Sequence, residues 1–156
     1  EHGLMTKNEL YETAHRVPMI VRCPERVPAG TVVENVVSTV DFQPTLLSLM
    51  GLASSGREQG RDASALLRGE SASWEDEAFI HHSSLERAGL FTPDWELAYV
   101  KGRDSILFDR RNDPHQTQNL FTSAAHADVI DELTRRIVQH HRDVNSPALQ
   151  WLEAVL

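Results

Sequence analysis

The chain has 156 residues, a formal net charge of −8 and one cysteine. The acidic balance disfavours a nucleic-acid or anionic-membrane surface, because both need clustered Lys and Arg to displace counterions. A single cysteine excludes an internal disulfide framework and a thiolate metal site. The length suffices for one domain with a core or for a domain remnant with a small appendage, and we favour the second.

The first segment carries a lysine just ahead of a predicted helix and strand. Lys7 follows a glycine-containing turn, and Asn8 is a candidate N-cap for a short helix through His15. Pro18 then begins a predicted apolar strand over residues 19–22. An ammonium in this position can bind an oxyanion such as phosphate or sulfate. The alternative is an exposed lysine without a role.

The next segment predicts a helix that begins and ends at recognisable signals. Residues 31–37 are rich in β-branched side chains and favour an extended chain, interrupted by Glu34. Asp41 is placed as the N-cap of the following helix, Pro44 falls in its first turn and Gly51 ends it. We expect the apolar stripe of this helix to pack on the sheet of a larger domain.

The second half predicts a small antiparallel sheet covered by a long helix. Residues 53–73 form a surface connection with one short helix over 63–67. A turn at 102–104 joins two of the strands as a hairpin. A helical stripe over 124–141 closes the sheet, and the apolar residues that follow Pro147 also need a surface to cover them. The expected strands are 77–82, 95–101 and 105–109.

The eight histidines do not form a metal-binding pattern. His81 and His82 are neighbours on a predicted strand and point to opposite faces, whereas His140 and His141 diverge around a helix. There is no His-Glu-x-x-His run. The sequence therefore predicts no intrinsic metal site.

Four motifs stand in the sequence in a recognisable order. They are Glu1-His2-Gly3-Leu4 with Lys7, Tyr11-Glu12 and Arg16-Val17-Pro18; Val40-Asp41-Phe42-Gln43-Pro44-Thr45-Leu46-Leu47 ending at Gly51-Leu52; Gly60-Arg61-Asp62 with Leu66-Leu67-Arg68-Gly69-Glu70; and Leu107-Phe108-Asp109 with Asn112-Asp113-Pro114 and Asn119-Leu120. In this order they resemble the formylglycine-dependent sulfatases of the alkaline phosphatase superfamily. Residues 71–94 carry none of the resemblance.

The resemblance implies a fold and one active-site residue. The fold class is α/β: residues 1–70 are the C-terminal end of an alkaline phosphatase-like catalytic domain, and residues 71–156 are a small α+β subdomain. The lysine at the position of Lys7 contacts the sulfate and the leaving oxygen in this family, which makes Lys7 the catalytic and substrate-binding candidate. His2 is a second substrate-binding candidate, with holding the turn as its alternative role. Arg16, Asp41, Arg61 and Asp113 match family positions but are interpreted as structural.

Two parts of the family's active site are missing from the sequence. The family's nucleophile is a formylglycine made from the cysteine of a Cys-x-Pro-x-Arg motif. Cys23 is followed directly by Pro24, so its spacing is wrong, and we interpret it as a small residue at the end of a strand. The family's metal-binding acidic pairs are also absent. The resemblance thus implies the C-terminal portion of a longer enzyme, with formylglycine and a divalent cation, usually calcium, held by residues outside this chain.

The leading hypothesis is a hydrolase of sulfate monoesters. Its partners would be an anionic small-molecule or carbohydrate sulfate ester and the upstream part of the same polypeptide, with no nucleic acid. A phosphonate monoester or phosphodiester hydrolase of the same superfamily is the enzymatic alternative. A non-catalytic interaction fragment, forming a homo-oligomer through an exposed sheet edge, is the alternative from another class. For substrate selectivity, His81, His82, Arg87 and Trp95 are candidates only because they are polar or aromatic and lie near loops.

Overall fold

The computed structural model describes residues 10–70, 73–81 and 84–155. Its contacts divide the chain into two compact units. The sheet unit comprises Glu1–Val17 and Ala78–Leu156, and the loop unit comprises Pro18–Glu77. Residues 10–17 thus group with the C-terminal sheet. The division of the full-length protein into a catalytic domain ending at residue 70 and a subdomain over residues 71–156 stays a prediction.

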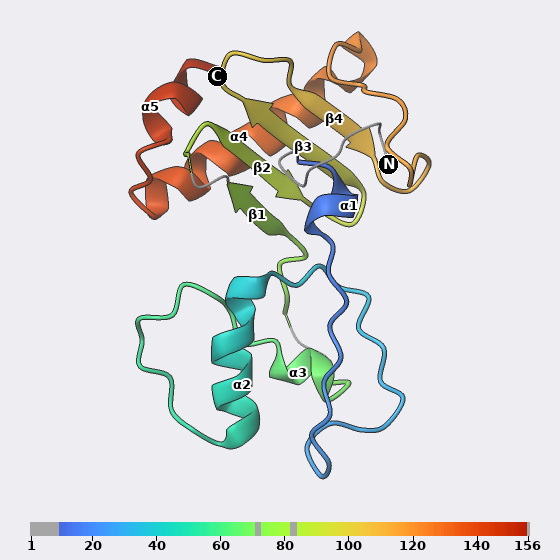
Figure 1. Ribbon diagram of the computed structural model, residues 1–156, viewed down its shortest axis with the longest axis vertical. Helices are drawn as coiled ribbons and strands as arrows, with labels where there is room; N and C mark the ends of the chain where they lie inside the picture. Colours follow the sequence, from blue (N-terminus) through green and yellow to red (C-terminus); the bar gives the residue numbers. More distant parts are fainter. Residues whose placement is uncertain (1–9, 71–72, 82–83, 156) are drawn as a thin grey trace. The chain divides into compact units, whose positions relative to one another are not determined.

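The sheet unit contains a four-stranded antiparallel sheet with its strands in chain order (Figure 1). The strands are β1 (Ala78–His81), β2 (Arg87–Phe91), β3 (Trp95–Val100) and β4 (Ile106–Asp109). Three of them confirm sequence predictions, and Gly102, at φ 74°, lies in the turn of the expected β3–β4 hairpin. Strand β2 was not predicted, because it lies in the segment that carried no recognisable pattern.

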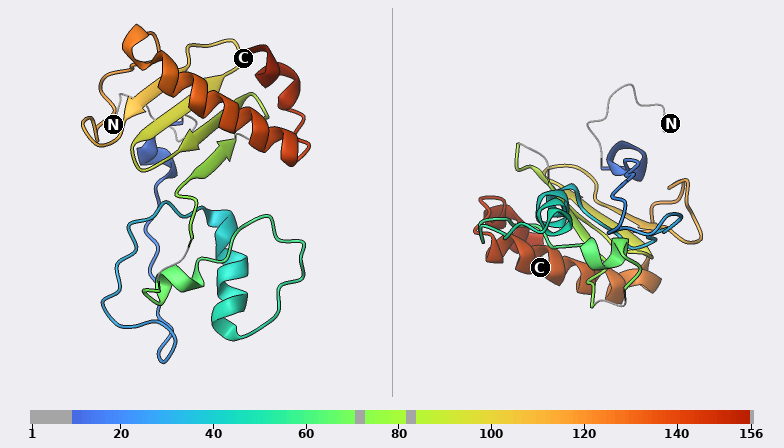
Figure 2. Two further views of the ribbon diagram at one scale, coloured as in Figure 1. Left: turned by 180° about the vertical axis from the view of Figure 1, so that it is seen from behind. Right: turned by 90° about the horizontal axis from the view of Figure 1, so that it is seen from below.

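One face of the sheet is covered by helix α4 (Ala127–Asp143), which follows a 3-10 turn at Ala124–His126 (Figure 2). Leu90, Leu97 and Leu107 from the sheet pack with Ile137 of α4 and are fully buried. This face is the hydrophobic core of the unit and confirms the predicted closure of the sheet by a long helix. No helix among the described residues is long and apolar enough to cross a membrane.

The end of the chain completes this core. Helix α5 (Leu149–Leu152) and a 3-10 turn at Glu153–Val155 follow the break after α4. Leu152 is fully buried, and the Trp151 indole Nε1 donates to the Leu85 carbonyl at 2.8 Å. Trp151 and Leu152 are therefore covered by the rest of the sheet unit, as the sequence predicted.

The opposite face of the sheet receives the first described residues of the chain. Leu10 is buried, and helix α1 (Glu12–His15) follows it. The Tyr11 ring lies 5.8 Å from that of Phe108 on β4, and the His15 ring lies 6.2 Å from that of Phe91 on β2. The predicted cap at Asn8 is wrong, because α1 begins later in the chain and its N-cap is Tyr11. Asn8 itself lies outside the described residues.

The described part of the loop unit contains two α-helices, α2 (Phe42–Met50) and α3 (Ser64–Leu67), and both confirm predictions. Gly51 ends α2 with φ 72°, and the Leu52 N–H donates to the Leu47 carbonyl at 2.9 Å. Asp41 is the N-cap residue as predicted, but its side chain does not cap α2. Instead it accepts from the Ser38 N–H at 2.9 Å, within a capping box around the preceding 3-10 turn (Thr39–Asp41).

The strand predicted over residues 19–22 is wrong. This segment is irregular, and Ile20 is 93% exposed. Residues 31–37 also form no strand. A strand requires a neighbour for its N–H and C=O groups, and no described segment pairs with either stretch. Cys23 accordingly does not end a strand but opens a turn, in which its carbonyl accepts from the Val27 N–H at 2.9 Å.

Candidate functional site

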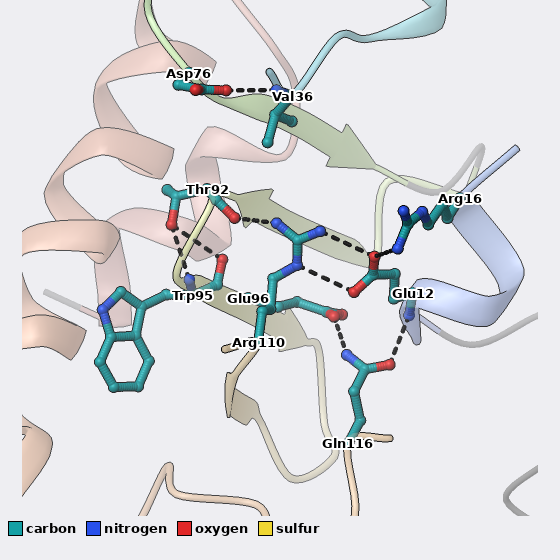
Figure 3. Close-up of polar contacts among 9 residues, drawn as sticks. All are labelled: Glu12, Arg16, Val36, Asp76, Thr92, Trp95, Glu96, Arg110 and Gln116. Atoms are coloured by element: carbon teal, nitrogen blue, oxygen red, sulfur yellow. Dashed lines mark hydrogen bonds and ion pairs between the residues drawn. The ribbon is translucent and has the colours of Figure 1, made fainter. Parts of the chain in front are cut away.

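The two residues singled out as substrate-binding, Lys7 and His2, lie outside the described residues. The described residues begin at Leu10, and the segment from Leu10 to Arg16 is held to the sheet by a polar network. We name this network the anchor and define it by Glu12 of α1, Glu96 of β3, Arg110 and Gln116 (Figure 3). Its members come from separate parts of the sequence and meet on the face of the sheet opposite α4.

The ion pair between Glu12 and Arg110 forms one half of the anchor. Arg110 Nε donates to Glu12 Oε2 at 3.1 Å, and its Nη2 donates to Oε1 at 2.9 Å. This two-point geometry fixes both side chains. Arg110 Nη1 also donates to the Thr92 carbonyl in the β2–β3 turn. Arg16 Nη1 adds a contact to Glu12 Oε1 at 3.2 Å, which confirms the pairing predicted across one helical turn.

The amide of Gln116 forms the other half of the anchor. Its Oε1 accepts from the Glu12 backbone N–H at 2.8 Å, and its Nε2 donates to Glu96 Oε2. The Glu12 N–H is one of the donors that a helix leaves without an internal partner at its first turn. Because no side chain caps α1 from Tyr11, Gln116 supplies this acceptor from 104 positions further along the chain.

The two carboxyl groups of the anchor have opposite electrostatic properties. Hydrogen bonding to Arg110 holds the pKa of Glu12 below its usual value, so this group is the anionic partner of the ion pair. Burial raises the pKa of Glu96 to about 9, despite the hydrogen bond from Gln116 and with added repulsion from Glu12. Glu96 is fully buried, and its Oε1 has no hydrogen-bond partner among the described residues. The anchor therefore holds one charged and one neutral carboxyl group at pH 7.

The family-matched residues of the loop unit hold its chain segments together. Asp41 Oδ1 accepts from the Arg61 backbone N–H at 2.7 Å, and the Arg61 guanidinium donates to the carbonyls of Glu75 (2.5 Å) and Glu77 (2.8 Å). The same guanidinium lies 4.2 Å from the ring centroid of Trp74. Figure 3 also draws the neighbouring contact in which the Val36 N–H donates to Asp76. These contacts are structural, as predicted for Asp41 and Arg61.

Asp113 also has the structural role predicted for it. Its Oδ1 accepts from the Thr117 hydroxyl at 3.0 Å and its Oδ2 from the Gln118 N–H at 2.8 Å. These bonds close the turn that contains Gln116, whose own backbone lies at φ 53°, in the left-handed region. The turn thereby sets the direction of the Gln116 side chain.

Five of the described histidines pack against other rings. His140 stacks on Phe79 with ring centroids 3.9 Å apart. His141 is buried, and burial lowers its pKa to about 4, with further contributions from His140 and His81. No group of three or more His, Cys, Asp or Glu side chains among the described residues could hold a metal ion.

The residues proposed from loop position alone are not gathered into one site. His81, at the end of β1, lies edge-on to His141 at 6.3 Å. Trp95 begins β3 and packs edge-on against His126 at 5.6 Å. Arg87 begins β2, and His82 lies outside the described residues. The described members of this set therefore do not form a common substrate-binding site.

The sequence did not single out Glu96, Arg110 or Gln116, because their partners lie 18 to 104 positions away along the chain. One local signal was present. Glu96 is the only charged residue in the otherwise uncharged strand β3, and such a residue is buried in a sheet only when a partner satisfies it.

Residues 1–143 match the family described as N-sulphoglucosamine sulphohydrolase, C-terminal. The chain is also 30% identical, over 168 aligned residues, to the N-acetylglucosamine-6-O-sulfatase of Bacteroides thetaiotaomicron, and the match covers the whole chain and 30% of that protein. The chain therefore belongs to the C-terminal family of the N-sulphoglucosamine sulphohydrolases, a branch of the sulfatases. This assignment confirms the resemblance found in the sequence motifs.

Solved structures support the same fold. BT4656 in complex with its substrate D-glucosamine-2-N,6-O-disulfate superposes with a TM-score of 0.68 at 21% identity, covering 80% of this chain and 28% of that one. The phosphonate monoester hydrolase of Agrobacterium radiobacter gives 0.59 at 22% identity, covering 71% and 26%. The α/β fold with a small antiparallel sheet and a long helix is thus that of alkaline phosphatase-like enzymes. The chain spans about a third or less of the length of these proteins.

Proposed function

We propose that the chain is the C-terminal part of a sulfatase that hydrolyses a sulfate monoester. The observation that carries this proposal is the family match over residues 1–143, which contains the Lys7 motif and the anchor together. Lys7 precedes Glu12 by five positions, so the segment with the candidate lysine leads directly into the part of the chain that the anchor fixes.

In this proposal the Lys7 ammonium binds the sulfate group and neutralises negative charge on the departing oxygen. A fixed cation accelerates cleavage of the S–O bond when it meets more negative charge in the transition state than in the ground state. His2 either contacts the sulfate or holds the turn ahead of Lys7. Both residues bind and orient the substrate and do not attack it.

The nucleophile and the metal belong to other residues of the full-length protein. The only cysteine, Cys23, lies in a turn and lacks the Cys-x-Pro-x-Arg spacing. The described residues also provide no metal-ligand cluster. The sequence therefore offers no cysteine with the spacing for formylglycine, and the part of the chain that the structure describes offers no set of calcium ligands. In the family these groups supply, respectively, the attacking oxygen and positive charge at the sulfate.

The exposed apolar residues of the loop unit support a role for residues 1–70 as the end of a larger catalytic domain. A larger domain that packs against this unit would remove these side chains from water, which is favourable. The upstream part of the same polypeptide is the proposed partner. The most exposed members are Ile20 (93%), Val32 (79%), Met50 (59%) and Phe42 (52%).

The proposed substrate class is a sulfated carbohydrate. The curated relative is named as acting on the 6-O-sulfate of N-acetylglucosamine, and the substrate bound to BT4656 is a disulfated glucosamine. Phosphonate monoesters are the second candidate class, because two phosphonate monoester hydrolases share the fold.

One comparison separates these two functions. The full-length protein is assayed for sulfate release from N-acetylglucosamine-6-sulfate and, at equal concentration, for hydrolysis of 4-nitrophenyl phenylphosphonate. The proposal predicts a kcat/KM for the sulfate ester that exceeds the phosphonate value by at least about tenfold, equivalent to about 1.4 kcal/mol of preferential transition-state binding. The reverse preference would assign the protein to the phosphonate hydrolases.

A further inference from the structure

Three histidines gather where the edge strand β1 meets helix α4. His81 ends β1, and His140 and His141 lie in the last turn of α4. The His141 ring lies edge-on to His81 at 6.3 Å and to His140 at 5.7 Å, measured between ring centroids. We name these three residues the histidine cluster. It places imidazole rings on both sides of the contact between the strand and the helix.

A second side chain of β1 also meets the cluster. The Phe79 ring stacks on that of His140, with centroids 3.9 Å apart and planes 3° from parallel. Phe79 and His81 are two positions apart on the strand, so both point to the sheet face that α4 covers. Each of the two α4 histidines therefore receives one ring from β1.

Strand β1 is the least buried strand of the sheet. It lies at one end of the sheet and, among the four strands, pairs with β2 alone (Figure 1). None of its four residues is buried, whereas β2, β3 and β4 each contain buried residues. Segments with few buried apolar contacts open at a lower free energy than the centre of a fold. We therefore expect the docking of β1 to depend on its contact with α4.

The buried member of the cluster is held in the neutral form. His141 is 2% exposed, and its Nδ1 has no hydrogen-bond partner among the described residues. The pKa of His141 is lowered to about 4, first by burial and then by repulsion from His140 and His81. A proton on His141 is therefore favourable only when the ring can reach water.

The other elements around the cluster add little charge to this contact. Arg142 pairs with Glu153 of the last 3-10 turn at 3.0 Å, and helix α5 contains no charged residue. On β2, the residue opposite His81 is the buried Ala88, and Glu86, which precedes the strand, is exposed. Protonation of the cluster would therefore place positive charge on both the strand and the helix, and like charges repel.

We propose that the histidine cluster is an acid-sensitive switch, which keeps β1 docked on α4 while its rings are neutral and releases the strand when they are protonated. β1 directly follows Glu77, the last residue of the loop unit. Release of β1 would thus lengthen the connection between the two units by its four residues. The switch acts on the fold, so it does not depend on which ester the protein hydrolyses.

The direction and size of the effect follow from His141. Its lowered pKa means that the docked state binds fewer protons than the released state. Docking is therefore fully supported above pH 6.5 and weakens as the pH falls toward 4. Between pH 7 and pH 5, the ratio of released to docked β1 should rise by about twentyfold.

Hydrogen exchange of the full-length protein, followed by mass spectrometry, measures this release. The rates are corrected for the intrinsic pH dependence of amide exchange. Peptides that cover residues 78–81 should lose protection by about twentyfold between pH 7 and pH 5, whereas peptides from the central strand β3 should change by less than about threefold. Constant protection of β1 would overturn the proposal. Equal losses in β1 and β3 would mean general acid unfolding and would overturn it as well.

Variants at position 141 locate the effect in the cluster. His141→Leu and His141→Phe fill the buried position with side chains that cannot be protonated. In either variant, the change in β1 protection between the two pH values should fall below about threefold. His115→Leu removes an exposed histidine outside the cluster and should keep the wild-type change. A twentyfold change that persists in a folded position-141 variant would assign the release to other groups and would overturn the proposal.

Discussion

Glu96 gives the sharpest stability prediction, because the structure buries a carboxyl group without a cation of its own. Its pKa is raised from 4.5 to about 9, chiefly by burial. A raised pKa means that the folded state binds a proton which the unfolded state has released. The contribution of Glu96 to stability is therefore fully present below pH 4.5, falls as the pH rises and is lost through pH 9.

The magnitude at neutral pH follows from the same values. The unfolded chain gains free energy by ionising Glu96 once the pH exceeds 4.5. The 2.5 pH units from there to pH 7, at about 1.4 kcal/mol each, give a loss on the order of 3 kcal/mol. Glu96→Gln cannot ionise and keeps an acceptor for Gln116. The variant should therefore gain about 3 kcal/mol relative to the wild type between pH 4.5 and pH 7.

Urea unfolding of both proteins at pH 4.5, 5.5, 7 and 8 measures this difference. Other titrating groups are common to both proteins and cancel in the comparison. Glu86→Gln makes the same chemical change at an exposed position of the sheet unit and should follow the wild type at every pH. A constant difference between wild type and Glu96→Gln across this range would show that Glu96 is ionised in the fold and would refute the reasoning.

Three further predictions concern contacts within each of the two units. Gly60→Ala should lower the free energy of unfolding by at least about 2 kcal/mol, because the new Cβ would lie 2.0 Å from the Val40 carbonyl oxygen. Gln59→Ala, the control, should leave the free energy of unfolding unchanged. Chemical denaturation measures both variants. Arg61→Lys should cost about 1–2 kcal/mol in the same assay, since a lysine cannot reach two carbonyls and the Trp74 face together; an unchanged stability would contradict the role of the guanidinium. His141 has a pKa lowered to about 4 by burial, so its contribution to stability is present above pH 6.5 and is lost as the pH falls through 4; His141→Leu should move acid unfolding, followed by circular dichroism, to lower pH, and a shift to higher pH would refute this sign.

Local signals in the sequence predicted much of the fold. Asp41, Pro44 and Gly51 mark the ends of α2, and Gly102 marks the turn between β3 and β4. Strand β2 was missed because Gly89 weakens its pattern. The structure explains that glycine, since a Cβ there would lie 3.0 Å from the Leu97 carbonyl oxygen on β3.

The errors and omissions arise from contacts that a local pattern cannot show. Residues 19–22 have the composition of a strand, but no described segment pairs with them. Lys7 was proposed because a motif surrounds it, whereas the anchor joins Glu12 to residues about a hundred positions away. A sequence motif could point to a candidate catalytic group but not to the side chains that hold Glu12.

In the proposed function this chain supplies Lys7 to a sulfate-cleaving active site. The most direct test is kcat/KM for sulfate release from N-acetylglucosamine-6-sulfate by the full-length protein, compared between wild type and Lys7→Ala. The proposed mechanism predicts turnover by the wild type and a loss of about a hundredfold or more in the variant, equivalent to about 3 kcal/mol of transition-state stabilisation. Equal rates in the two proteins, or no sulfate release by the wild type, would contradict it.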